Sequence, residues 1–448
     1  MADDGEPDLN RARICIDFGT ALSKASVCVD PLLPLEVGVR PLPIGTVSGA
    51  EHPLLTPSIL LVDRGRMYFG PTAFEHARMG GGDPLLSFKT VLGARNIEEA
   101  LNSKLRQTID PTGTFRQRDA LVLYLAHLDQ LIREAIKLPL NLPPSVVNAK
   151  RRYTSPAWKP GDGSDRAFEA IFNEAAAVSQ KLGRLLLGED GISIAQCKDA
   201  LDKAAAAPLD SRLETGVFEP HAAAAASLAF STEPTRFVVV FDVGAGTTDI
   251  AAFEFDERTD PPSLGEIKEA RQCSGLAGDE IDRILIEMFW RKRGANRSRD
   301  DEMTALRTTK LLARELKQQL FATGRCSLKN GMFATTVTIE ELAEEPKFRE
   351  YQTALGRTLA ASLQVVTARA EAAGAPFIDV VLAGGGSNLP FLPELTRIAG
   401  AGRKVNLRIA PLSPDSALYA GVDPALGGAF PQIAMSVGGA LVEMMPRA

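Results

Sequence analysis

The sequence predicts an α/β protein of two similar lobes, mainly because one strand–turn–strand pattern occurs twice. The clearer copy, Phe237 to Phe255, has an apolar strand, Asp242, a small-residue turn and a second apolar strand. The other copy, Ile14 to Val29, repeats this layout around Asp17. Each copy is typical of a β-hairpin with a glycine turn. The two aspartates are 242 − 17 = 225 residues apart, half of the 448-residue chain, which indicates two lobes with one hairpin each.

The turns of both hairpins are suited to hold phosphate groups. Glycines let backbone N–H groups approach an anion closely, and threonine hydroxyls add donors. Asp242 and Asp249 bracket the second turn, so both carboxylates would face the same anion. A carboxylate beside a phosphate is repulsive unless a cation lies between them, so this pair predicts Mg²⁺ held largely through its waters. The alternative for one copy alone is an ordinary tight hairpin. The duplication argues against it and predicts one nucleotide between the lobes. The turn residues are Gly19, Thr20, Ala21, Gly244, Ala245, Gly246 and Thr247.

Composition excludes several classes of function. With 45% hydrophobic and 24% charged residues, the chain reads as globular and large enough for two or more domains. The net charge of −6 argues against nucleic-acid binding, and the basic run Trp290 to Arg299 is interpreted as a solvated helix end. Five cysteines show no metal or disulfide spacing. No apolar run is long enough for a membrane span and the acidic N-terminus is unlike a signal peptide, so we expect a cytoplasmic protein.

The remaining elements of the first half follow in order. Pro31 to Pro53 is expected to be a connection, and Thr56 to Gly70 two short strands around a turn. Gln117 to Lys137 has apolar residues at helical spacing, which predicts a helix with His127 in the core. An insertion over residues 183–215 is expected to be a helix pair or a loop whose role the sequence does not indicate. Glu219 and Pro220 then begin an alanine-rich helix.

That helix is a candidate part of the site. Proline is favoured in a first helical turn, and a glutamate beside it can reach a metal-bound water. Its alanines, Ala222 to Ala226, would let two lobes approach closely at a hinge. The alternative is a helix that is merely alanine-rich. The hairpin at Phe237 to Phe255, about ten residues downstream, favours the functional interpretation.

Three elements are expected near the C-terminus. Ile378 to Leu395 predicts a buried strand, a glycine turn and a helix start near Pro390, with Gly384 and Gly385 allowing close approach of a ligand. Pro411 to Phe430 is a long loop and so a candidate functional one. Pro431 begins a last helix.

The order and spacing of these segments resemble the actin-like ATPase superfamily, which includes actin, sugar kinases and the seventy-kilodalton heat-shock chaperones. SFKTVLG, Ser87 to Gly93, resembles the chaperones' segment around a lysine near the γ-phosphate. Lys89, Glu219-Pro220 and Gly384-Gly385 together favour the chaperone branch. The resemblance covers about Arg13 to Met445. It implies an actin-like fold: two lobes, each with a ribonuclease-H-like mixed sheet, and a nucleotide cleft between them.

The resemblance also implies a domain layout. The first lobe would span residues 11–232, with an upper subdomain at about 46–116, and would be closed by the last helix at 431–445. The second lobe would span 236–424, with an upper subdomain at about 276–349. Residues 1–10 would be a disordered tail. No peptide-binding domain is expected.

Site roles follow from the resemblance residue by residue. Lys89, Glu219, Asp242 and Asp17 are expected to be catalytic, and the last three to hold Mg²⁺ through water. The family's adenosine helix matches Leu311 to Phe321, with Lys317 in register but Arg314 where the family has a glutamate. The later glycine turn departs from the family's serine and arginine positions. Its expected nucleotide contacts are Gly384, Gly385, Gly386 and Asn388.

The leading hypothesis is a chaperone-like protein that binds ATP or ADP and hydrolyses ATP with Mg²⁺. Its nucleotide state would control an unidentified protein partner, with no nucleic acid, membrane or peptide clamp involved. Three alternatives stay open. One is a sugar-type kinase with Asp17 or Asp242 as its base, the second an actin-like filament protein, and the third a nucleotide sensor without hydrolysis.

Overall fold

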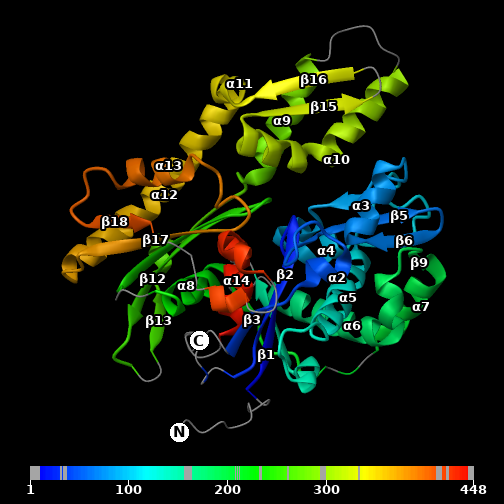
Figure 1. Ribbon diagram of the computed structural model, residues 1–448, viewed down its shortest axis with the longest axis horizontal. Coiled ribbons are helices and arrows are strands. Elements are labelled where there is room, and N and C mark those ends of the chain that lie inside the picture. Colours follow the sequence, from blue (N-terminus) through cyan, green and yellow to red (C-terminus); the bar gives the residue numbers. More distant parts are fainter. Residues whose placement is uncertain are drawn as a thin grey trace.

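The computed structural model shows two lobes side by side, with an upper part on each (Figure 1). It describes residues 11–441 apart from 31–32, 34–37, 156–163, 207, 209, 211, 232–234, 260–261, 293–298, 331–332, 410–415 and 420–422. The expected tail at 1–10 and the end of the expected last helix lie outside these residues. Within them, no helix is long and apolar enough to cross a membrane.

The first lobe is built on a mixed sheet whose strand order is β10-β8-β1-β2-β3, with β4 beside β2. β1 runs antiparallel to β2 and parallel to β8, so the hairpin forms the middle of the sheet. Its strands are β1 (Arg13–Asp17), β2 (Leu22–Cys28), β3 (Val39–Pro41), β4 (Thr56–Pro57), β8 (Lys150–Ser155) and β10 (Val217–Phe218).

The second lobe repeats this topology with the order β13-β12-β11-β17-β18, and β14 beside β12. Again a central hairpin, β11 with β12, is extended by parallel strands on one side and an antiparallel strand on the other. This repetition confirms the predicted α/β fold with a mixed sheet in each lobe. The strands are β11 (Phe237–Val243), β12 (Thr248–Asp256), β13 (Ser263–Glu266), β14 (Gln272–Ser274), β17 (Phe377–Ala383) and β18 (Asn406–Ile409).

Two helices, α8 (Glu219–Ala229) and α14 (Phe430–Ala440), lie between the sheets (Figure 1). Alanines of α8 share a core cluster with β11 and β12, whereas α14 packs on the first sheet. The contact between them is close because a methyl group at Gly438 would overlap the carbonyl oxygen of Ala222. Outer helices cover the sheets: α5 (Gln117–Ala135) and α6 (Ser164–Leu182) in the first lobe, α12 (Pro346–Ala372) and α13 (Leu392–Gly400) in the second.

Each lobe carries an upper subdomain. In the first, a sheet of order β7-β5-β6-β9 includes β9 from the expected insertion. Its elements are β5 (Ile59–Asp63), β6 (Arg66–Phe69), α3 (Gly70–Arg78), β7 (Leu85–Leu86), α4 (Ile97–Asn102), β9 (Ile192–Ser193) and α7 (Ile194–Ala204). The second has α9 (Gly278–Lys292), α10 (Arg299–Thr323), β15 (Arg325–Asn330), β16 (Phe333–Thr338) and α11 (Ile339–Glu344).

Several sequence-based boundaries need correction. The expected connection before Pro53 contains β3 and the helix α2 (Ile44–Ser48), because Val39, Leu42 and Ile44 are buried. Helix α13 begins at Leu392, two residues beyond Pro390. Helix α14 ends at Ala440, because Leu441 takes up an extended backbone. The expected loop at 411–430 contains two short 3₁₀ helices, Ser416–Tyr419 and Pro424–Ala429.

Candidate functional site

The two hairpin turns face one another across the lobes. A methyl group at Gly246 would lie 3.2 Å from Cγ2 of Thr20 in the first hairpin. It would also lie 2.9 Å from Cγ2 of Thr90, which belongs to the 3₁₀ turn Phe88–Gly93. That turn carries Lys89. The structure therefore brings the two predicted phosphate turns and the predicted lysine together.

Four buried carboxylates gather at this meeting point: Asp17, Glu219, Asp242 and Asp249. Two buried lysines accompany them. Lys24 forms an ion pair with Asp17 at 2.7 Å, and Lys89 forms one with Glu219 at 2.5 Å. The hydroxyl of Thr154 on β8 also donates to Asp17 at 3.0 Å. Buried carboxylates are costly unless they are paired, so a site with four of them and two lysines retains surplus negative charge.

Strand register explains why Lys24 and Asp249 take part. Asp17 lies opposite Lys24 in the first hairpin, and Asp242 lies opposite Asp249 in the second. Opposite residues of an antiparallel pair project to the same face of the sheet. The sequence analysis named Asp249 beside Asp242 but missed Lys24. Superposing the two hairpins would have found Lys24, since it follows Asp17 by seven residues, as Asp249 follows Asp242.

Burial and mutual electrostatic interaction shift the pKa values of these buried groups. Burial raises the pKa of Asp242 well above its ordinary value, and the charges of Glu219 and Asp249 raise it further. Burial likewise raises the pKa of Glu219, although Lys89 opposes this shift. For Lys89, burial works toward a lower pKa, but Glu219 and Asp17 overcome it, so the pKa rises. An added cation would therefore stabilise the ionised form of these acids.

The donor set fits a hydrated Mg²⁺. Oδ1 of Asp242 and Oδ2 of Asp249 are buried and have no hydrogen-bond partner. No three metal-binding side chains of the described residues converge closely enough to hold an ion directly. An ion that keeps most of its waters would satisfy both observations, because those waters can donate to the free carboxylate oxygens.

The glycine turn after β17 lies against the second hairpin. Gly384 has a φ of +80°, and a methyl group there would overlap Oδ1 of Asp242. The backbone N–H of Gly386 donates to the carbonyl oxygen of Val243 at 2.8 Å. Gly385 and Asn388 are exposed beside them. Glycine at 384 is therefore required both by the backbone conformation and by the position of Asp242.

Lys317 on α10 lies close to the same hairpin. Its ammonium group donates to the carbonyl oxygen of Gly278 at 2.9 Å and pairs with Asp282 at 2.8 Å. The first residue of α9, Gly278, in turn donates its N–H to the carbonyl oxygen of Gly244 at 3.0 Å. Arg314, one turn before Lys317, instead reaches the first lobe, where it donates to Ser87 at 2.9 Å.

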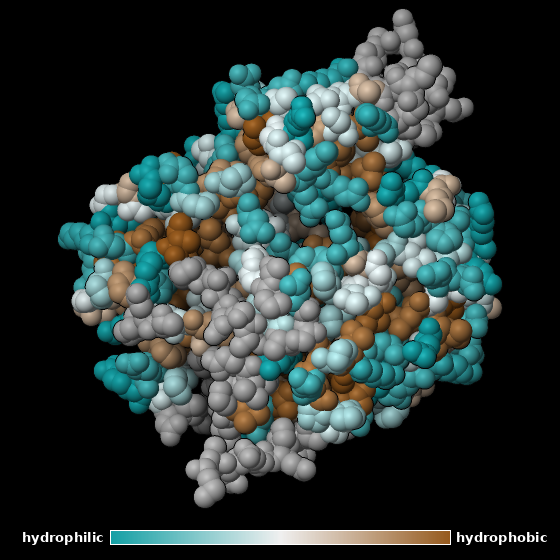
Figure 2. Space-filling view, in the orientation of Figure 1, coloured by the Kyte–Doolittle hydropathy of each residue, from teal (hydrophilic) through white to brown (hydrophobic). Residues whose placement is uncertain are grey.

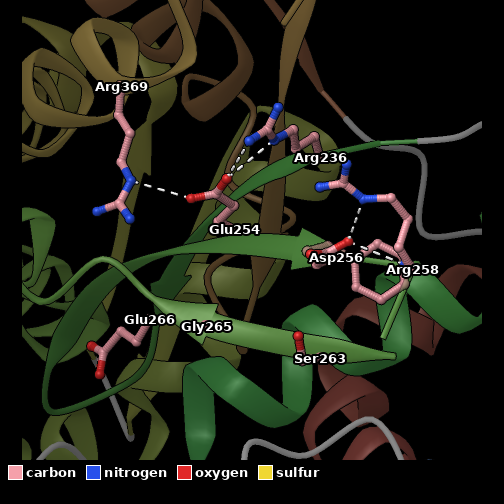
Figure 3. A pocket seen from close by; sticks show the side chains of 9 residues that line it. Arg236, Glu254, Asp256, Arg258, Ser263, Gly265, Glu266 and Arg369 are labelled. Carbon is pink, nitrogen blue, oxygen red and sulfur yellow. Dashed lines mark hydrogen bonds and ion pairs between the residues drawn. The ribbon is translucent and has the colours of Figure 1, made fainter. Parts of the chain in front are cut away.

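The molecular surface is hollowed where these turns lie, below the upper part of the second lobe (Figure 2). A separate pocket of about 240 Å³ lies beside β13 (Figure 3). The charged side chains that line this pocket mostly pair with one another, as in Arg236 with Glu254 at 2.7 Å and Arg258 with Asp256 at 3.0 Å. None of the predicted site residues lines that pocket.

Comparison with known proteins agrees with this geometry. A family model described as Hsp70 protein matches residues 205–421, which include the second hairpin, α10 and the glycine turn. The chain is 25% identical over 417 residues to "Heat shock 70 kDa protein 2" of Paracoccidioides lutzii, a match that covers 91% of this chain. It is also 25% identical over 206 residues, 45% of this chain, to "Heat shock 70 kDa protein" of Neurospora crassa.

The chain is therefore similar to the Hsp70 family, over just under half of its length by the family model and at 25% identity to the two relatives. Its repeated mixed sheets are those of the actin-like ATPase fold that this family shares. The matches span 56% of the first relative and 31% of the second.

Proposed function

We propose that this chain binds Mg·ATP between its two lobes and hydrolyses it as a chaperone-like ATPase. The observation that carries the proposal is the buried cluster of four carboxylates and two lysines where the hairpin turns meet. Such a cluster is costly to bury and is retained where a bound ligand and its metal complete the charge balance. Similarity to a nucleotide-binding family supports the same ligand.

In this proposal, different groups of the chain bind the phosphates, hold the metal ion and stabilise the transition state. Backbone N–H groups of the turns at Gly19 to Ala21 and Gly244 to Thr247 bind the phosphates. Bound Mg²⁺, held through its waters by Asp17, Asp242 and Glu219, would supply positive charge beside the phosphates. Lys89 adds a second positive charge where negative charge grows during attack by water on the γ-phosphate.

Glu219 and Lys89 are well placed to act together. Their 2.5 Å ion pair fixes the lysine against a carboxylate that comes from the helix between the lobes. Glu219 would also accept a hydrogen bond from the attacking water and so orient it. Lys317, Gly384 to Gly386 and Asn388 would contact the nucleoside side of the ligand.

Thermal unfolding tests the binding step. The melting temperature should rise by a few degrees with Mg·ATP, because a ligand at 100 times its Kd stabilises the folded state by about 2.7 kcal/mol.

Lys89→Ala should keep this shift yet lose most of the ATP hydrolysis, since Lys89 acts mainly in the transition state. No shift at millimolar ATP, with or without Mg²⁺, would contradict the proposal. A shift without hydrolysis would favour the nucleotide sensor instead.

A further inference from the structure

Ser87, two residues before Lys89, has an unusual backbone. Its φ of 52° and ψ of 26° place it in the left-handed region. That region is uncommon for residues other than glycine, and it persists where surrounding contacts impose it. The turn that carries Lys89 starts at this residue, so whatever holds Ser87 also sets the position of Lys89.

The contacts that hold Ser87 come from the other lobe. Its hydroxyl donates to Oδ2 of Asp279 on α9 at 2.9 Å, and it accepts from Nη2 of Arg314 on α10, also at 2.9 Å. The same arginine nitrogen lies 3.4 Å from Oδ1 of Asp279. The three side chains therefore form a closed triangle across the two lobes.

Asp279 is itself fixed to the second phosphate turn. Its backbone N–H donates to the carbonyl oxygen of Ala245 at 2.7 Å. On the other side of the triangle, the hydroxyl of Thr90 donates to the carbonyl oxygen of Ser87 at 2.7 Å. A continuous set of hydrogen bonds thus joins the turn that binds phosphate to the turn that carries Lys89.

We propose that Ser87, Asp279 and Arg314 are positioning residues that set Lys89 against the phosphate turn when the two lobes come together. This inference rests on the proposed ATPase function. The side chains of Arg314 and Asp279 are 29% and 36% exposed, so their ion pair contributes little to stability. Its effect is geometric, because displacing a reacting group by about 1 Å can cost about a hundredfold in rate.

The triangle also gives Arg314 a role. The family's adenosine helix has a glutamate here, and in this chain the guanidinium group is directed to Ser87 and Asp279. Substituting Arg314 should therefore change the chemical step more than the affinity for ATP.

Arg307 provides a matched control on the same helix. It lies seven residues before Arg314 and so on the same face of α10. It also crosses to the first lobe, where it donates to the carbonyl oxygens of Gly81 and Gly82 and pairs with Asp83 at 3.0 Å. None of these partners belongs to the Lys89 turn.

The first experiment measures single-turnover hydrolysis and ATP affinity. Ser87→Ala and Arg314→Gln should lower the single-turnover rate by about ten- to a hundredfold, with a much smaller change in Kd for ATP. Arg314→Lys should recover part of the rate because it keeps one donor. Arg307→Gln should leave the rate unchanged. If Ser87→Ala folds poorly, Ser87→Gly removes the same hydroxyl while glycine tolerates the left-handed backbone.

The second experiment needs no hydrolysis. Mass spectrometry would compare acetylation of Lys89 and Lys24 by an amine-reactive ester in the nucleotide-free chain. Ser87→Ala and Arg314→Gln should raise acetylation of Lys89 severalfold and leave that of Lys24 unchanged. The same acetylation of Lys89 as in the wild type, or an equal rise in Arg307→Gln, would overturn the proposal. A wild type that neither binds nor hydrolyses ATP would instead defeat the proposed function, while acetylation still decides the positioning role.

Discussion

Asp242 is the residue at which folding and the proposed function are most opposed. It lies in a buried site beside Glu219 and Asp249, and burial with these charges raises its pKa well above the ordinary value. A carboxyl whose pKa is raised on folding favours the folded state while protonated. That contribution is present below the ordinary pKa of about 4 and is lost as pH rises through the folded pKa.

The nucleotide-free Asp242→Asn variant should therefore be more stable than the wild type at pH 7 to 8. The gain should disappear toward pH 4, where the wild-type carboxyl is protonated as well. The variant should also lose the stabilisation by Mg·ATP. Denaturant unfolding from pH 4 to 8 measures both effects.

Asp256→Asn is the control for this prediction. Asp256 is a partly exposed acid whose pKa is lowered by its hydrogen bond to Arg258, so its substitution should change stability little. A loss of stability in Asp242→Asn at neutral pH would show that the ionised carboxylate stabilises the empty site, contrary to this account.

Among the contacts between helices and strands, the one between α8 and α14 sets the spacing of the two lobes. Alanines of α8 and glycines of α14 let the two helix backbones approach closely between the sheets. A methyl group at Gly439 would likewise overlap Sγ of Cys15 on β1. Small residues here set the distance between the lobes and thus the distance between Glu219 and Lys89.

Gly438→Ala should destabilise the protein by about 1–3 kcal/mol, because the new methyl group meets the backbone of α8 and a packed core cannot absorb it cheaply. Gly356→Ala is a matched control within helix α12. There the methyl group would make an ordinary 3.6 Å contact with Leu395, so the helical preference of alanine should stabilise the protein by up to about 1 kcal/mol. Chemical denaturation of both variants measures the difference. Equal effects would mean that the helix contact adapts easily.

At the scale of the whole molecule, the lobes contact each other at two levels. The α8–α14 pair joins the two sheets, and α10 reaches the first lobe's upper subdomain through Arg307 and Arg314. Leu311, between these arginines, packs against the core cluster of Ile59 and Leu61. Rotation about the lower contact would change the upper one, which is the geometry of a hinge. We propose that this motion lets nucleotide state control a partner protein.

Affinity capture tests that proposal. The Lys89→Ala variant, held with ATP, should retain at least one protein about five- to 150-fold better than with ADP, which is the usual range of coupling between two sites. Capture without nucleotide is the control for non-specific binding. Identical proteins at equal amounts under all three conditions would contradict control by nucleotide.

Much of the site was predictable because its parts are local in sequence. Each hairpin was identified from apolar strands around a glycine turn. Glu219-Pro220 was assigned from its resemblance to the chaperones, and the rules for helix starts agree with that assignment. The seven-residue offset that pairs Asp17 with Lys24 and Asp242 with Asp249 is also local, and it follows from strand register. Secondary-structure boundaries failed mainly where short apolar stretches between prolines became buried, as at Val39 and Leu42.

Which of these parts meet depends on the tertiary structure. Lys89 and Glu219 are 130 residues apart in the chain, and Ser87 and Arg314 are 227 apart. No periodicity or turn signal connects such residues, because their contact depends on how the two lobes pack about α8 and α14. Local sequence patterns are enough to specify two hairpins that suit phosphate and a helix that begins at Glu219. Lobe packing decided that these meet in one buried charge cluster, and that Arg314 joins Asp279 to the turn that carries Lys89.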